Sequence, residues 1–308
     1  MVNVAIAGGT GGVGRTILET LQPSTKHRAF VLSRQESKEN PNAIAVDYND
    51  IDGLVSVFEK NDIHTVICAF AVEGDSLGTS QMNLIKAATR SQSTKRFIPT
   101  GYAIPYPKEA LQNLPQLKDH FVALDELRNS GLEWTIFYNG IFLDYYGTPA
   151  LKSYLKPNVF VLDIANKVAA IPGDGNVPVT FTYTFDLAKF VVAALDLERW
   201  EQETRVVGEE LTWNQFLALA EEVLETKFEV HYDTVEKLKR LEITELPGHK
   251  ALYTHFPKAP FQQFMSIFEY FTTDGSSHVQ RAGSLNERFP ELTLLSAREL
   301  LEKYWKGK

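Results

Sequence analysis

The chain has 308 residues, of which 44% are hydrophobic and 23% are charged, a composition typical of a globular protein with a sizeable core. Acidic residues outnumber basic ones by 39 to 31, and no basic run exceeds two residues, so we expect no nucleic-acid binding. No apolar run approaches the roughly 20 residues that span a bilayer. The first apolar segment starts at residue 2 without a basic leader. These features predict a cytoplasmic protein that does not enter a membrane.

The chain has one cysteine and seven histidines. Cys68 lies in an apolar, strand-like segment, so no internal disulfide can form, and we expect a buried, inert thiol. None of the histidines stands at a recognised ligand spacing from another histidine, cysteine or carboxylate. We therefore predict no metal site.

The N-terminal segment is an apolar run that breaks into glycines and continues with the pattern of a helix. Residues 2–6 predict a strand, and Val13, Ile17 and Leu21 recur at helical spacing. The glycines between them fit both G-x-G-x-x-G and G-x-x-G-x-x-G, a pattern that favours a dinucleotide site over a purely structural turn. The predicted cofactor contacts here are Gly8, Thr10, Gly11, Gly12, Val13 and Gly14.

The end of the second predicted strand distinguishes between the two nicotinamide dinucleotides. An acidic residue about 20 positions after the glycines binds the ribose of NAD, whereas a basic one accommodates the 2′-phosphate of NADP. Here the strand ends in Ser33 and Arg34, with Lys38 four residues on. A guanidinium, a hydroxyl and an ammonium suit a phosphate dianion. We therefore predict NADP(H), although Glu36 offers an alternative ribose contact.

Apolar segments alternate with amphipathic ones through the first half of the chain. After residue 6, the predicted strands are 28–32, 43–46, 64–70, 96–99 and 134–137. Helical patterns lie around residues 13–21, 54–58, 82–88 and 117–127, and Gly131 caps the last of them. This alternation predicts the α/β class, with a Rossmann doubly wound parallel sheet.

Beyond about residue 147 the alternation stops. Residues 168–183 read as two strands around a Gly-Asp-Gly-Asn turn, and helices are expected at 185–197, 213–225, 235–241, 261–272 and 296–305. We therefore expect an NADP-binding Rossmann domain at 1–147. A smaller C-terminal α+β substrate-binding region is expected at 148–308, with the two interleaved in space.

Open α/β sheets bind their ligands at the carboxyl ends of the strands. The residues predicted to flank the cofactor there are Asp47, Phe70, Thr100, Gly101 and Asn139. Those predicted to contact the substrate are Tyr102, Phe142, Tyr145 and Phe264, the last from a C-terminal concentration of aromatic residues. That concentration suits a pocket for a flat, apolar molecule or, equally, a plain hydrophobic core.

Three catalytic patterns are missing. The only Tyr-x-x-x-Lys pair, Tyr304 with Lys308, lies at the C-terminus, so the mechanism of classical short-chain dehydrogenases is not expected. A G-x-S-x-G elbow is absent, and no Gly-Lys-Ser/Thr follows the glycine turn, which argues against a serine hydrolase and a phosphate-binding P-loop. Hydride chemistry or dinucleotide sensing is left.

Several segments together resemble the NmrA-like, isoflavone-reductase-like branch of atypical short-chain dehydrogenases. They are Gly8-Gly-Thr-Gly-Gly-Val-Gly14, Val31-Leu-Ser-Arg34, Lys95-Arg-Phe-Ile-Pro-Thr-Gly101, Ser130-Gly-Leu-Glu-Trp-Thr-Ile136, Ile171-Pro-Gly-Asp-Gly-Asn176 and the closing stretch 290–305. The resemblance implies NADPH and the reduction of aromatic or conjugated secondary metabolites. The family also includes regulators that bind the dinucleotide without turning it over and act through protein partners.

In the reductases of this family, a lysine about eleven residues before the glycine of the Ser-Gly-Leu segment acts as general acid or base. Counting back from Gly131 gives His120, and Lys118 lies two residues earlier. At about 100° per residue, His120 lies about 60° from the centre of the apolar helix face and Lys118 about 100°. His120 is thus the first catalytic candidate and Lys118 the second, with an ordinary core histidine as the alternative. An unperturbed imidazole would titrate at about 6.5.

Two functions follow as expectations. The first is an NADPH-dependent reductase of a small aromatic or conjugated substrate, in which His120 or Lys118 donates a proton or stabilises the developing anion. The second is a non-catalytic NADP(H)-binding redox sensor of the NmrA type. The sequence leaves the oligomeric state open.

Overall fold

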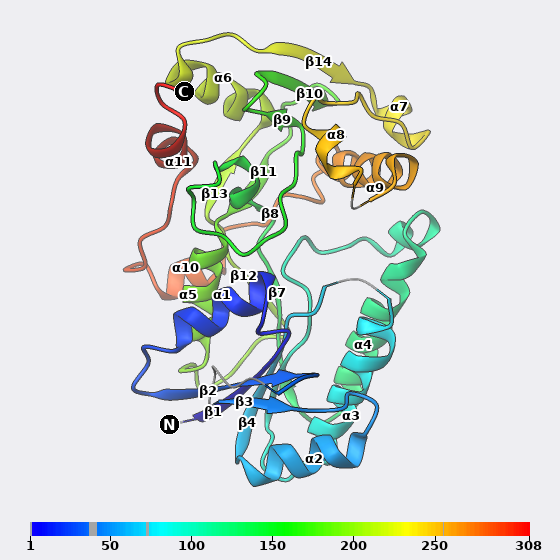
Figure 1. Ribbon diagram of the computed structural model, residues 1–308, viewed down its shortest axis with the longest axis vertical. Helices are drawn as coiled ribbons and strands as arrows, with labels where there is room; N and C mark the ends of the chain where they lie inside the picture. Colours follow the sequence, from blue (N-terminus) through cyan, green and yellow to red (C-terminus); the bar gives the residue numbers. More distant parts are fainter. Residues whose placement is uncertain (1, 37–41, 72–73, 255) are drawn as a thin grey trace.

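The computed structural model describes residues 2–36, 42–71, 74–254 and 256–308. Its central element is a six-stranded parallel sheet in the order β3-β2-β1-β4-β5-β6 (Figure 1). The strand order reverses between β1 and β4, which is where open sheets of this type bind ligands. The strands are β1 (Val2–Ala7), β2 (His27–Ser33), β3 (Ala43–Ala45), β4 (Ile63–Cys68), β5 (Arg96–Ile98) and β6 (Glu133–Trp134).

Helices cover both faces of this sheet, as the predicted doubly wound fold requires. Successive side chains of a strand point to opposite faces, and β1 shows this directly. Val4 and Ile6 pack toward α1 (Gly12–Leu21) and α5 (Thr184–Ala194), whereas Ala5 and Ala7 face the other way. The opposite face is covered by α2 (Ile51–Lys60), α3 (Met82–Arg90) and α4 (Lys118–Asn129) (Figure 1).

The predicted strand 134–137 is two strands with different partners. β6 pairs with β5, whereas β7 (Ile136–Tyr138) pairs in parallel with β12 (Glu203–Arg205). The change occurs at the buried Thr135, whose hydroxyl is hydrogen-bonded to that of Thr204 at 2.7 Å. A continuous apolar run carries no mark of such a partner change, so the sequence predicted one strand.

The two strands predicted within 168–183 are present, and they lie in different sheets. β10 (Val168–Pro172) lies between β9 (Leu162–Asp163) and β14 (Glu229–Asp233), whereas β11 (Val179–Thr182) lies between β8 (Ile141–Phe142) and β13 (Glu209–Leu211). Gly173 and Gly175 have φ of 60° and 71°, the left-handed region that the turn requires. The remaining helices are α6 (Trp213–Leu224), α7 (Val235–Lys239), α8 (His249–Leu252), α9 (Lys258–Tyr270), α10 (Leu285–Arg288) and α11 (Ala297–Tyr304).

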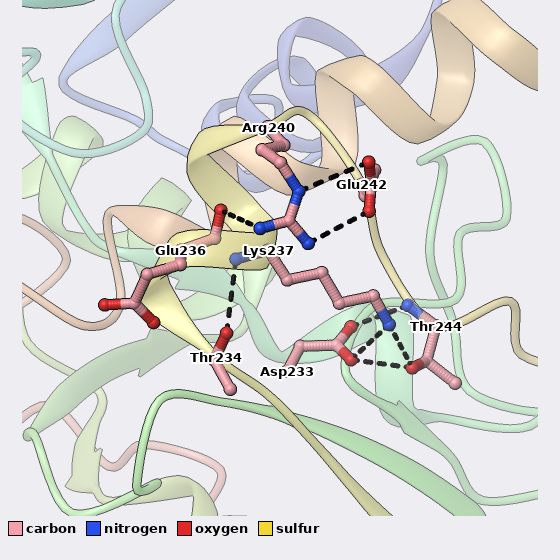
Figure 2. A network of polar contacts seen from close by, with 7 residues as sticks. All are labelled: Asp233, Thr234, Glu236, Lys237, Arg240, Glu242 and Thr244. Carbon is pink, nitrogen blue, oxygen red and sulfur yellow. Dashed lines mark hydrogen bonds and ion pairs between the residues drawn. The ribbon is translucent and has the colours of Figure 1, made fainter.

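A polar network joins β14, α7 and the loop that follows (Figure 2). The Asp233 carboxylate, only 1% exposed, accepts hydrogen bonds from the Thr244 backbone N–H and hydroxyl, both at 2.6 Å. The Lys237 ammonium lies 2.7 Å from the same carboxylate and donates to the Thr244 hydroxyl at 2.7 Å. Both oxygens of this buried group therefore have partners.

The second half of the chain contributes to the first. α5 lies side by side with α1, although about 160 residues separate them, and β12 completes the pairing of β7 (Figure 1). The 147/148 boundary stays a prediction. Two elements from beyond it, α5 and β12, pack against elements that precede it. In the described part of the chain, every helix is too short or too polar to cross a membrane.

Candidate active site

The glycine turn between β1 and α1 has two kinds of glycine. Gly8 has φ of 83°, and a Cβ there would collide with the Ala69 carbonyl oxygen. A Cβ at Gly14 would collide with the carbonyl oxygen of Gly8, which places the helix tightly against the turn. These two glycines are required by the protein's own packing, as the sequence pattern predicts.

Gly11 and Gly12 face open space instead. A Cβ at either position would meet no atom within 4 Å among the described residues beyond its chain neighbours. Gly11 is the N-cap of α1 and has an extended backbone, with no side-chain hydrogen bond capping the helix. The first N–H groups of a helix lack intrahelical partners and attract anions. The turn therefore offers the room and the donors that a pyrophosphate needs, next to the predicted contacts Thr10 and Val13.

The residues predicted to select NADP lie at the end of β2. Arg34 is exposed, and the Ser33 hydroxyl accepts a hydrogen bond from the Gln35 N–H at 3.2 Å. Burial raises the pKa of Tyr48, and the charge of Arg34 partly offsets that rise, so the guanidinium lies near this ring. Asp47 is exposed and accepts from the Asn49 N–H at 2.9 Å. Lys38 lies outside the described residues.

The ends of β4 and β5 are joined through Thr100. Its hydroxyl accepts from the Phe70 N–H at 3.1 Å and donates to the Cys68 thiol at 3.4 Å. Burial raises the pKa of Cys68 to about 12, so the thiol stays protonated, as expected of an inert core cysteine. The Thr100 N–H in turn donates to the amide oxygen of Gln81 at 2.8 Å. Phe70 packs edge-on against Tyr48, with ring centroids 5.1 Å apart.

His120 and Lys118 differ sharply in burial. His120 is 4% exposed on the inner side of α4, whereas Lys118 is the first residue of that helix and is exposed. Burial lowers the pKa of His120 to about 4, and a hydrogen bond with the Thr100 backbone opposes this only in part. The imidazole is therefore neutral at pH 7. The unperturbed value of about 6.5 does not apply to His120, because the ring is almost completely covered.

Aromatic side chains surround the His120 ring. Tyr106 and Phe121 meet it edge-on, with ring centroids 5.5 and 5.2 Å away. Tyr106 also meets Phe268 of α9 at 6.1 Å, and Phe268 meets the predicted substrate residue Phe264 at 4.5 Å. The segment that precedes α4 thus packs against α9. In Figure 1, α9 is drawn above this segment. Phe264 itself is 39% exposed at the outer end of this row.

The other predicted residues lie around the same strand ends. Tyr145 is half-buried, and burial, the charge of Asp144 and the nearby Tyr106 raise its pKa. Tyr102 instead stacks on Phe137 on the α5 side of the sheet, away from these rings. Phe142 packs edge-on against Tyr145, with ring centroids 6.2 Å apart, and Gly101 lies against the Ile136 side chain. The backbone N–H groups of Asn139 and Gly140 both donate to the Ala103 carbonyl.

A model of the NmrA-like family matches residues 2–292. The chain belongs to the NmrA-like family. Oxidoreductase BOA1 of Botryotinia fuckeliana is 35% identical to this NmrA-like protein over 298 residues, which cover 95% of the chain and 96% of the relative. This whole-length match confirms the predicted family and the predicted oxidoreductase class.

Solved structures give the same fold. Leucoanthocyanidin reductase from Vitis vinifera in binary complex with NADPH matches the NmrA-like protein with a TM-score of 0.73 at 19% identity, over 98% of both chains. AtPrR2 with NADP+ and (+)-pinoresinol matches with a TM-score of 0.73 at 18% identity, again over 98% of both chains. The Rossmann fold predicted from the alternation of strands and helices is thereby confirmed.

Three residues near His120 in the NmrA-like protein were not predicted from its sequence. Tyr106 was not predicted at the site, and Phe268 belongs to the aromatic concentration that suits a pocket or a core; nothing local shows that the two meet across the two halves of the chain. Gln81 sits between Ser80 and Met82 at the start of a helical pattern and looks like a surface residue. It is completely buried, at the end of the π-helical turn Ser76–Gln81. Such turns are frequent at functional sites but leave no simple sequence signal.

Proposed function

We propose that the protein is an NADPH-dependent reductase of a small, uncharged aromatic or conjugated substrate. The observation that carries this proposal is an unbroken line of contacts at the switch point of the sheet. It runs from Gly8 against Ala69, through the Phe70 N–H on Thr100, to the His120 ring. The open cofactor-type turn and the buried histidine therefore belong to one site.

The residues present fit an NADP cofactor. The open positions at Gly11 and Gly12 and the uncapped start of α1 suit the pyrophosphate, and the exposed Arg34 suits the 2′-phosphate. Ser33, Lys38, Asp47 and Asn139 remain predicted contacts. When bound, the cofactor supplies a hydride. The NADPH and NADP+ complexes of the two structurally similar reductases support this choice.

His120 is the residue to which we assign the handling of the proton. A neutral imidazole has one N–H and one nitrogen that only accepts. The Thr100 backbone contact favours protonation, which is the effect of a carbonyl that accepts from the ring N–H. The second nitrogen then accepts from a water and orients it; this water protonates the anion formed by hydride transfer and is itself reprotonated from solvent. Lys118, exposed at the helix start, is the weaker candidate.

The surroundings of His120 favour a neutral, flat substrate. Tyr106, Tyr145 and Phe268 present rings, and burial raises the pKa of both tyrosines, so their hydroxyls stay uncharged. A charged substrate would lose its hydration against these rings, which carry no charge to replace it. The aromatic (+)-pinoresinol bound by the structurally similar AtPrR2 supports this substrate class.

Turnover and binding assays test the proposal together. NADPH consumption would be measured with a panel of aromatic enones and ketones, and NADPH affinity by titration. We expect His120→Ala to lower kcat by about 10²- to 10⁴-fold with little change in NADPH affinity, whereas Lys118→Ala stays near the wild type. An active His120→Ala with an inactive Lys118→Ala would reverse the assignment. Tight NADPH binding without turnover of any substrate would instead favour the sensor function.

A further inference from the structure

Gln81 is a buried amide that the proposed chemistry does not use. It is 0% exposed and ends the π-helical turn that leads from β4 into α3. Its oxygen accepts from the Thr100 N–H at 2.8 Å, but its nitrogen has no hydrogen-bond partner among the residues that the structure describes. Leaving a buried donor unpaired destabilises a protein. A side chain chosen only for packing would be apolar here.

The oxygen of Gln81 replaces a missing strand partner. β5 ends at Ile98, so the Thr100 N–H lies beyond the ladder and needs an acceptor from elsewhere. A glutamate would supply the same acceptor without an unpaired N–H, but it would add a negative charge. Glutamine is the residue of matching length that keeps the acceptor neutral.

Thr100 contacts both the cofactor side of the proposed site and the His120 side. Its hydroxyl fixes the Phe70 N–H on the cofactor side, and its backbone meets the His120 ring on the other. The ring faces Tyr106 and Phe121, both uncharged, and the influences on its ionisation are burial and the Thr100 backbone. A displacement of Thr100 would move Phe70 and His120 relative to each other, and a new charge at residue 81 would act on the imidazole.

We propose that Gln81 is a positioning residue for the reductase reaction: its neutral oxygen holds Thr100 so that the cofactor-side turn and the His120 ring keep one relative placement. This inference rests on the proposed function. It assigns to Gln81 no contact with substrate or cofactor, only an action through Thr100.

Two substitutions separate the two properties of the amide. Gln81→Leu removes the acceptor, and Gln81→Glu keeps an acceptor but adds a charge. We expect both to lower kcat by about 10- to 100-fold, as small misplacements of catalytic groups do, with NADPH affinity within about threefold of the wild type. Only Gln81→Glu should raise the pKa of His120, measured by NMR of the labelled ring. Its kcat relative to the wild type should recover as the pH falls through the pKa of the new carboxyl, which burial raises.

Asn286 provides the matched control. Its amide is buried like that of Gln81, but both ends have partners: the Val207 N–H donates to its oxygen at 2.9 Å, and its nitrogen donates to the Val207 carbonyl at 2.7 Å. Asn286→Asp should lower the thermal midpoint without moving the titration of His120. Wild-type kcat in a folded Gln81→Leu variant, or an unmoved His120 titration in Gln81→Glu, would overturn the proposal. If the wild type binds NADPH but reduces nothing, the proposed function fails, while the ring titration still decides whether Gln81 acts on His120.

Discussion

Two buried polar side chains each form a hydrogen bond with a threonine: Asp233 in the C-terminal region, and Gln81 beside the carboxyl end of β5 in the large sheet. Asp233 has a partner for each oxygen: the backbone and hydroxyl of Thr244 and the ammonium of Lys237 (Figure 2). Gln81 uses its oxygen and leaves its nitrogen unpaired. The difference separates polar groups that hold a region together from those that stability alone would not retain. Gln81 is of the second kind, and it is bonded to Thr100 at the proposed site.

The largest expected effects come from substitutions in the glycine turn, where one glycine is needed for folding and another only for the cofactor. Gly14→Val should prevent folding, because the new Cβ would collide with the Gly8 carbonyl. Gly11→Val should fold normally, since the backbone there is extended and the added Cβ has open space around it in the part of the chain that the structure describes. It should nevertheless lose NADPH binding. Circular dichroism and the NADPH-induced rise in thermal midpoint test both; a normal rise in Gly11→Val would make the turn purely structural.

The Asp233 network tests the stabilising side of the comparison. Asp233→Ala leaves the Thr244 N–H and the partly buried Lys237 without their acceptor, so we expect a loss of about 3 to 5 kcal/mol in the free energy of unfolding. The exposed Arg240–Glu242 pair, with N–O distance 3.3 Å, is the control in the same loop. Glu242→Ala should cost less than about 1 kcal/mol. Equal losses in urea titrations would mean that burial does not distinguish the two.

The burial of His120 should make the free energy of unfolding depend on pH. Its pKa is about 4 in the folded protein and about 6.5 when unfolded. Below pH 6.5 the unfolded chain binds a proton that the folded one refuses, so stability is full above pH 6.5 and falls until about pH 4. The loss should total about 3 kcal/mol. His120→Gln should flatten this part of the stability curve, and an unchanged slope would contradict the lowered pKa. The contribution of His120 to kcat should be constant from about pH 5.5 to 8.

The smallest expected effect concerns Arg34, the exposed cation predicted to bind the 2′-phosphate. A charge-assisted hydrogen bond contributes about 1.5 to 3 kcal/mol, so Arg34→Ala should weaken NADPH about 10- to 150-fold. NADH, which lacks the phosphate, should bind almost as before. Equal losses for the two cofactors in parallel titrations would remove the phosphate contact. Arg28→Ala, at an exposed arginine near the start of β2, serves as the control.

The fold could be predicted from local pattern because each strand and helix of the sheet carries its own periodicity and turn residues. The glycines and Arg34 belong to that local chemistry. The inward direction of His120 followed from helix geometry, and the structure confirms its burial. The divergence of β10 and β11 into two sheets and the meeting of Tyr106 with Phe268 depend on contacts between distant segments, which periodicity does not encode. The burial of Gln81 depends in addition on a π-helical turn that shifts its direction.

The position of α5 sets a limit on when the N-terminal half can fold during synthesis. Residues 2–147 include all six strands of the large sheet, but the apolar face formed by Val4, Ile6 and Ile17 is covered by residues 187–195. A ribosome that has released only the first half leaves that face open to water or to other nascent chains. That face is covered only after α5 has emerged. A polypeptide cut at residue 147 should therefore aggregate rather than bind its cofactor.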